Sequence, residues 1–312
     1  MLTHVRTLEP VMIADLDTLL IALYVELTDR IIPLLGLARC GPGQRPEVTD
    51  AELACLAVAQ VLLRFDDERH WLRAAPQRVG HLFPRLLGQS EYNARVKNAA
   101  PLLEAALRWL ADRTPATAEL VRLLDATPVP CGQSVVTAKR SGLFGWAGYG
   151  YCPSHSRWYW GSKLMLMCTC EGTVTGFGLA NPKLCGERDQ ARQMLRDHPA
   201  NRPAPGTAVV ADKGFAGEGT EEFFAAPGLD LTLIRPARKN EPARYFPGWL
   251  RQRVEAIIWT LKNQLGLERH GGRVPAGLWA RIVQRLLALN AVIWFNWQIG
   301  APVKRSLIAY DH

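Results

Sequence analysis

Three acidic residues, far apart along the 312-residue chain, have the type and setting expected of metal ligands: Asp125, Asp212 and Glu255. Asp125 follows the apolar run VRLL and Asp212 follows AVVA, so we expect each at the polar end of a buried strand. Because an unpaired buried charge is very costly, each aspartate then needs a partner. Aspartate is also common where a turn follows a strand, so either residue taken alone is equally consistent with a purely structural role.

Glu255 lies in a segment, residues 249–266, whose apolar spacing predicts a helix. At 100° per residue, one stripe of this helix collects the apolar side chains Val254, Ile257, Ile258, Leu261 and Leu265. Glu255 falls just beside the stripe together with Arg251 and Lys262, which predicts a position on the rim of the core and not out in solvent. An ordinary ion pair between Arg251 and Glu255 explains those two residues but leaves the aspartates without a role.

A shared metal site gives all three acids a role. Three carboxylates that converge on one point repel one another unless divalent cations lie between them, and oxygen ligands favour Mg²⁺ or Mn²⁺. Two such ions about 4 Å apart can activate a water or a 3′-hydroxyl and stabilise the oxygen that leaves a phosphodiester. The neighbouring Arg251 and Lys262 would then hold a DNA backbone. Trp259, one turn beyond Glu255, is expected to pack against the sheet more readily than to stack on a base.

The charge distribution points to a negatively charged partner, with nucleic acid first among the possibilities. The chain carries a net charge of +8. Residues 235–285 contain eleven Lys or Arg against three acids, so this one segment carries an excess equal to that of the whole chain. Basic proteins that bind no DNA are common, so charge supports this interpretation without establishing it.

The element pattern predicts an α/β protein with a helical N-terminal region. Helical spacing occurs in residues 15–27, 52–65 and 100–113, and Thr49-Asp50 predicts a helix start. The acid run 66–68 is expected to be a solvated helix face. From about residue 119, the predicted order is strands at 120–129, 163–170 and 173–180, a helix at 187–198 and a strand that runs into a glycine-containing turn at 207–215. A helix at 218–226, a strand at 230–237, and helices at 249–266 and 276–299 follow. This is the order of a ribonuclease-H-like mixed sheet flanked by helices.

Several segments together resemble DDE-type bacterial insertion-sequence transposases. Arg251, Glu255 and Lys262 match that family's spacing of an Arg, three residues, a Glu, six residues and a Lys. DATPVPCG (125–132) and ADKGF (211–215) resemble its two aspartate motifs, and residues 151–181 resemble the hairpin between them. FPRLLGQSEYNARVK (83–97) is similar to the 982 family of insertion sequences. The family's tyrosine, three residues before the Arg, falls on Gly248, although Tyr245 lies nearby.

The resemblance implies that Asp125, Asp212 and Glu255 are the catalytic, metal-binding triad for Mg²⁺, with Mn²⁺ able to substitute. It implies that the partner is DNA, both the terminal inverted repeats of an element and a target. The residues that it implies bind this DNA are Arg251, Lys262, Lys213, Arg269 and Arg273. It further implies a helical region (1–115) that binds DNA ends, a catalytic domain (116–300), a tail (301–312) and a homodimer on DNA. A ribonuclease-H-like nuclease without strand transfer and a DNA-binding relic that no longer cuts are the alternatives.

Cysteine usage and the chain start predict a reduced, cytoplasmic protein, and the resemblance implies a bacterial, nucleoid-associated one. The seven cysteines are odd in number and irregularly spaced, and the first residues lack the basic start and apolar core of a signal peptide. A zinc site at Cys152, His155, Cys168 and Cys170 is less favoured than buried thiols. Residues 286–303 hold no charge but include polar side chains, so we expect a buried helix and no membrane span.

Overall fold

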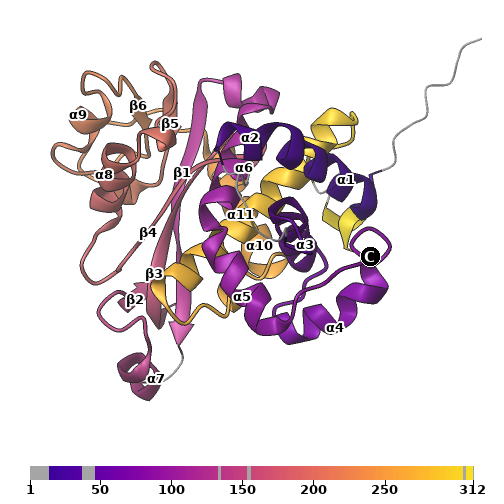
Figure 1. The fold of residues 1–312 in the computed structure, drawn as a ribbon. Coiled ribbons are helices and arrows are strands. Elements are labelled where there is room, and N and C mark those ends of the chain that lie inside the picture. The colour runs from indigo at the N-terminus through magenta and orange to yellow at the C-terminus, as the bar shows by residue number, and fades with distance from the viewer. Residues whose placement is uncertain (1–13, 37–45, 133–134, 153–155, 305–306, 312) are drawn as a thin grey trace, which may run out of the picture.

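A six-stranded mixed sheet runs through the centre of the molecule and separates two groups of helices (Figure 1). The computed structural model describes residues 14–36, 46–132, 135–152, 156–304 and 307–311. The strands are β1 (Val121–Gly132), β2 (Gly148–Cys152), β3 (Arg157–Cys168), β4 (Val174–Ala180), β5 (Ala208–Val210) and β6 (Thr232–Ile234). The protein is thus a mixed α/β structure, as the sequence predicts.

The strand order places β1 and β3 at the centre of the sheet. The order is β2-β3-β1-β5-β6, and β4 pairs with the second half of β3. β1 runs antiparallel to β3, with Asp125 opposite Leu166, and parallel to β5, with Leu123 opposite Val210. β5 and β6 are also parallel. The sheet is therefore antiparallel across β1, β3 and β4 and parallel at its short edge strands β5 and β6.

Helices of the N-terminal region and the C-terminal end lie on one face of the sheet, and α8 and α9 lie on the other (Figure 1). The helices are α1 (Leu16–Glu26), α2 (Ile32–Leu34), α3 (Asp50–Leu62), α4 (Glu68–Arg78), α5 (Gln89–Asn98), α6 (Ala100–Asp112), α7 (Val135–Arg140), α8 (Glu187–Asp197), α9 (Thr220–Phe224), α10 (Gly248–Asn263) and α11 (Pro275–Gln298). A π-helical turn, Leu27–Ile31, joins α1 to α2, and 3₁₀ turns occur at Pro115–Ala118, Pro199–Asn201, Lys213–Phe215, Leu267–Arg269 and Leu307–Tyr310.

α11 connects the helical region to the sheet. Its Asn290 is fully buried, and its side-chain amide donates to Leu107 O in α6 at 3.1 Å and to Val174 O in β4 at 2.9 Å. Its carbonyl accepts from Val174 N at 2.8 Å, so both ends of the amide are satisfied. α11 is long and apolar enough to cross a membrane, but 94% of its most apolar window is buried. The expected buried helix is confirmed.

Local signals explain where several elements start and turn. Thr49 and Glu52 form a capping box at the start of α3, with Glu52 N donating to Thr49 Oγ1 at 3.1 Å. Gly172, in the turn between β3 and β4, has φ +109°. A side chain at that position would be strained and would contact Ile257 of α10. The predicted Glu171-Gly172 turn is therefore confirmed.

Strand boundaries differ from the prediction, as at β3, which begins at Arg157 and not at residue 163. β1 continues to Gly132, so Asp125 lies inside this strand and not at its end. Pro128 and Pro130 fit here because β5 pairs with only residues 121–123, which leaves that edge of β1 without a described partner strand farther along. β5 ends at Val210, two residues before Asp212, where the sequence predicts that the strand runs into a turn. The short strand β2 has no counterpart in the prediction.

Candidate active site

Asp125 faces the side of the sheet on which α10 packs. Leu123 and Val129 of β1 belong to the core on that side, whereas Leu124 belongs to the core beneath α8. Because successive side chains of a strand alternate between faces, Asp125 points with Leu123 and Val129. Its backbone position is fixed by the pairing with Leu166 of β3. A carboxylate is thereby held by the central strand of the sheet.

Asp212 lies beside Asp125 in the order of the sheet. It follows the end of β5 by two residues, and the pairing of Leu123 with Val210 brings the continuation of β5 level with Asp125. Asp212 caps the 3₁₀ turn Lys213–Phe215, with its Oδ1 accepting from Gly214 N at 2.8 Å. One carboxylate oxygen is thus used to fix the turn. The strand-end position predicted for Asp212 is confirmed.

The surroundings of Asp125 raise the pKa of its carboxyl to about 7. Burial is the largest cause, and the nearby Asp212 and Glu187 carboxylates add to it. A hydrogen bond from Ala126 N to Oδ1, 2.7 Å long, and the Arg251 guanidinium act in the opposite direction. Acidic groups therefore outweigh the positive charge around Asp125.

Glu187, in the first turn of α8, is an acid of this site that the sequence did not reveal. Its Oε2 and the Oδ1 of Asp212 both lie within 3.4 Å of the point where a side chain on Gly214 would begin. Lys163 Nζ of β3 lies 3.8 Å from Glu187 Oε1. Burial and Asp212 raise the pKa of Glu187, against the effect of Lys163. An acid in the first turn of a helix is common for reasons of the helix dipole, so the pattern alone gave no signal.

Glu255 lies on α10 and is linked to the site through Arg251. Arg251 Nε is 2.9 Å from Glu255 Oε1, and the same guanidinium lowers the pKa of Asp125. The Glu255 side chain is 53% exposed, so it is more open to solvent than the predicted rim position. Lys262 lies farther along α10, and its Nζ pairs with Glu268 at 2.9 Å. Arg251 therefore interacts with both Glu255 and Asp125.

Trp259 is exposed, contrary to the prediction that it packs against the sheet. Its side chain is 55% exposed on α10, one turn beyond Glu255. The four core-facing residues Val254, Ile257, Leu261 and Leu265 fill the contact with the sheet, and Trp259 projects from another side of the helix. An exposed indole beside the acidic site is available to stack on a base.

The donors at this site suit a hard divalent cation in their chemistry. Asp125, Asp212, Glu187 and Glu255 offer only carboxylate oxygens, which are the ligands that Mg²⁺ and Mn²⁺ prefer. Among the residues that the structure describes, no group of three or more His, Cys, Asp or Glu side chains is arranged closely enough to hold a metal ion. A shared ion would therefore require Glu255 or Glu187 to move toward the two aspartates.

The remaining predicted residues are spread around the molecule. Lys213 is exposed directly after Asp212, and Arg269 is paired with Asp66 at 3.2 Å. Arg273 is exposed on the segment before α11. His155 of the less favoured zinc set lies outside the described residues, and Cys168 is fully buried, with burial raising its thiol pKa. Arg269 and Arg273 thus contact or border other parts of the molecule, Arg269 at Asp66 and Arg273 on the segment before α11.

Comparison with known proteins places the chain in a family. Residues 116–291 match the model described as the transposase DDE domain. The match spans more than half of the chain, and the protein belongs to this family of DDE-type transposases. No curated protein matches the sequence. Among solved structures, the chain is similar to a piggyBac transposase in a synaptic complex with hairpin DNA, studied by cryo-EM. The identity is 9%, the TM-score is 0.44, and the match covers 96% of this chain and 79% of the other.

Proposed function

We propose that this protein is a DNA transposase that cuts at the ends of an insertion sequence and joins the freed 3′ ends to target DNA. Membership of the DDE transposase family supports the class. The observation that carries the proposal is Asp125 on β1 beside Asp212, which follows the neighbouring strand β5 by two residues, with α10, the helix that bears Glu255, packed against β1. The excess of Lys and Arg in residues 235–285 suits a polyanionic partner.

The proposed fold of the catalytic region, residues 116–300, is ribonuclease-H-like. In its support, three antiparallel strands (β1, β3 and β4) are followed by a helix, two parallel strands (β5 and β6) and the C-terminal helices α10 and α11. The order β4-β3-β1-β5-β6, with β1 at the centre, puts the first aspartate on the middle strand. We assign residues 1–115 to DNA-end binding, residues 301–312 to a tail, and the chain to the 982 family of insertion sequences.

In the proposed mechanism, Asp125, Asp212 and Glu255 hold Mg²⁺ or Mn²⁺. The bound ions would supply the positive charge that activates a water or 3′-hydroxyl and stabilises the departing oxygen. Arg251 changes partner, leaving Glu255 for a phosphate of the DNA backbone, and frees the carboxylate to turn toward the aspartates. Lys213 holds the phosphate next to the scissile bond, and Lys262 holds the backbone farther along. Two copies of the chain bring the two ends together.

Cleavage and joining on DNA that carries the element's ends test this proposal. We expect nicked and joined products with Mg²⁺ or Mn²⁺ and none with EDTA or Ca²⁺ alone. Cutting without joining would replace the proposal with a plain nuclease. Binding without cutting, under every divalent metal that supports related chemistry, would replace it with a relic that has lost catalysis.

A further inference from the structure

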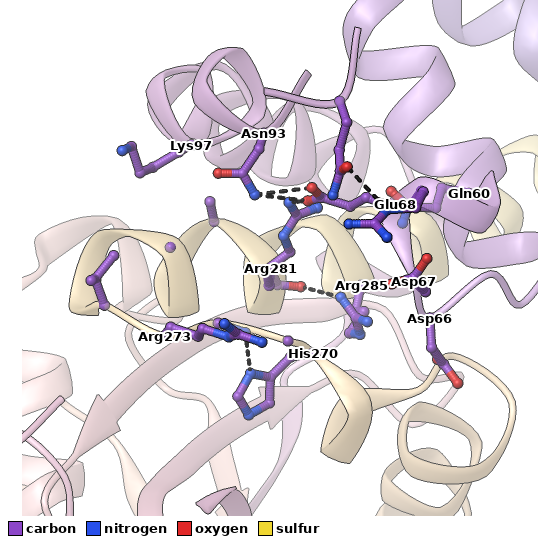
Figure 2. Close-up of a pocket in the computed structure, with 17 residues that line it drawn as sticks. Gln60, Asp66, Asp67, Glu68, Asn93, Lys97, His270, Arg273, Arg281 and Arg285 are labelled. Carbon is purple, nitrogen blue, oxygen red and sulfur yellow. Dashed lines mark hydrogen bonds and ion pairs between the residues drawn. The ribbon is translucent and has the colours of Figure 1, made fainter. Parts of the chain in front are cut away.

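A cavity of about 510 Å³ lies between the helical region and the segment that leads into α11. One wall is the face of α5 that carries Gln89, Asn93 and Lys97, and residues 66–69 continue it. The facing wall is residues 270–274 and the first turns of α11 (Figure 2). Its volume falls within the range of about 300–1,000 Å³ typical of ligand pockets. It is separate from the acids of the candidate active site.

The three acids of this cavity are already engaged. Asp66 pairs with Arg269, and Asp67 Oδ1 caps α4 by accepting from His70 N at 2.8 Å. Glu68 is ion-paired with Arg281 and accepts from the Asn93 amide at 3.0 Å (Figure 2). The expectation of a solvated face holds for the exposed Asp67, whereas Glu68 departs from it as the counter-ion of the buried Arg281. The charge of each acid is used within the fold.

The cations of the cavity outnumber these acids and are incompletely matched. Lys97 and Arg273 are exposed, and neither side chain has a hydrogen bond or ion pair within the described residues. Arg285 is 4% exposed and donates to the backbone carbonyls of Gly266, Arg281 and Arg269, with no carboxylate in direct contact. Burial and Arg281 lower the pKa of Arg285 to about 10, against the opposing effect of Asp66, and the guanidinium stays charged at neutral pH. The cavity therefore keeps unused positive charge.

The wall that bears Arg273 is fixed to the central strand of the sheet. His270 Nε2 donates to Pro130 O of β1 at 3.0 Å, and Nδ1 accepts from Gly272 N at 3.0 Å. Burial lowers the pKa of His270 to about 4, so the imidazole is neutral and keeps both bonds. α11 begins on the same wall, and Val274 provides no side-chain cap. A ligand held here is thus positioned relative to the strand that carries Asp125.

We propose that this cavity binds a phosphate group of a DNA strand, held by Lys97 and Arg273 with the buried charge of Arg285 behind them. A lone anion is small for a cavity of about 510 Å³, whereas a phosphate within a nucleotide chain brings flanking sugars that can occupy the remaining volume. The inference rests on the proposed function for the identity of the strand. It adds a second contact, outside the catalytic acids, that spans the helical and catalytic regions.

Salt dependence of DNA binding tests the proposal on the full-length chain. The double variant Lys97→Gln/Arg273→Gln is compared with Arg73→Gln/Arg78→Gln, which removes the same charge from exposed positions of α4 outside the cavity. Fluorescence anisotropy with a short labelled duplex of arbitrary sequence gives Kd over a range of salt concentrations. We expect the cavity variant to bind roughly tenfold more weakly at low salt, with a slope of log Kd against log salt shallower by about 1 to 2. The α4 variant should match the native chain.

The outcomes separate this inference from the proposed function. Equal slopes for the cavity variant and the native chain, with DNA binding intact, would overturn the cavity as a phosphate site and leave the transposase proposal standing. A native chain that binds no duplex at any salt would overturn both. Circular dichroism and thermal melting of each variant establish that the fold is kept.

A second arm distinguishes a DNA strand from a free nucleotide as the source of the phosphate. Thermal shifts are measured with inorganic phosphate and with thymidine monophosphate on the native chain and the cavity variant. We expect a small shift for the native chain only, at millimolar concentrations, because a single phosphate lacks the rest of the backbone. Tighter binding of the free nucleotide than of the duplex would overturn the assignment to DNA.

Discussion

The candidate active site and the basic cavity are both attached to β1, but their charges are unbalanced in opposite directions. Around Asp125, the carboxylates of Asp212 and Glu187 outweigh the nearby Arg251. In the cavity, Lys97 and Arg273 remain unmatched after every acid has a partner. A site built from acids repels a phosphate backbone unless cations are supplied. Under the proposed function, the contrast predicts that DNA is held mainly by the basic cavity and cut at the acidic site.

The largest effect is expected when an acid of the active site is removed. Asp212→Asn should lower strand cleavage by about a thousandfold or more, because a neutral amide is a poor ligand for Mg²⁺. Binding of duplex DNA should stay within a factor of about three, since the cavity is unchanged. Cleavage by Asp197→Asn, which alters an exposed acid of α8, serves as the control. Cleavage that survives in the Asp212 variant would contradict the hypothesis that the acidic site cuts DNA while the basic cavity holds it.

A smaller effect is expected when Glu187 is changed, and its size tests which acids of the site bind the metal directly. Glu187→Gln should reduce cleavage by roughly 10- to 100-fold, and higher Mg²⁺ should partly restore it, as for a residue that orients ligands. Glu255→Gln should abolish cleavage at every Mg²⁺ concentration, as a direct ligand would. The titration of activity with Mg²⁺ separates the two. If the variants exchanged behaviours, Glu187 would be the third ligand and Glu255 the supporting acid.

The acidic site should also reveal itself through stability in the absence of metal. The Asp125 carboxyl has a folded pKa of about 7, above the ordinary value of 3.8, so the folded state holds its proton more tightly than the unfolded state. Stability is therefore lost as pH rises from about 4 to 7. Asp125→Asn escapes this loss and should exceed the native chain by roughly 1–3 kcal/mol at pH 8, with no gain at pH 4. Urea unfolding in EDTA measures the difference, and parallel pH profiles would contradict it.

The basic cavity should show the opposite pH dependence, with a smaller amplitude. His270 has a folded pKa of about 4, below the ordinary value of 6.5, so folding disfavours its protonated form. The neutral His270 therefore contributes its full stabilisation above about pH 6.5. This stabilisation is lost as pH falls toward 4, which lowers the free energy of unfolding by about 1–2 kcal/mol. His270→Gln removes this titration, so the steepness between pH 6.5 and 4 should decrease. An unchanged slope in urea unfolding over that window would show that the imidazole is already solvated.

Periodicity located most of the elements, because helices and strands here bury regular apolar faces. The stripe on α10 and the capping residues of α3 were predictable for this reason. The interior position of Asp125 was not, since Pro128 and Pro130 normally indicate the end of a strand. They are compatible with β1 only because β5 is short, which depends on a strand some eighty residues away in the sequence.

The site was predictable where a motif fixed its spacing and unpredictable where only tertiary packing brings groups together. Asp125, Asp212 and Glu255 followed from the motifs, and their joint use as ligands remains a prediction. Glu187 and the cavity depend on how α8, α5 and α11 meet the sheet, and no local pattern encodes those contacts. Trp259 was assigned to the core because aromatic residues usually pack there, but four smaller side chains already complete that contact.

α11 has a consequence for how the gene can be divided. Its Asn290 bonds to α6 and β4 at once, and its Gln284 donates to Ala57 O of α3 at 2.7 Å. A fragment that begins after residue 115 would expose this apolar helix to water and remove two of those acceptors, Leu107 O for Asn290 and Ala57 O for Gln284. Expression of the catalytic half alone should therefore yield aggregated material, and any truncation intended for crystallisation must retain α3 and α6.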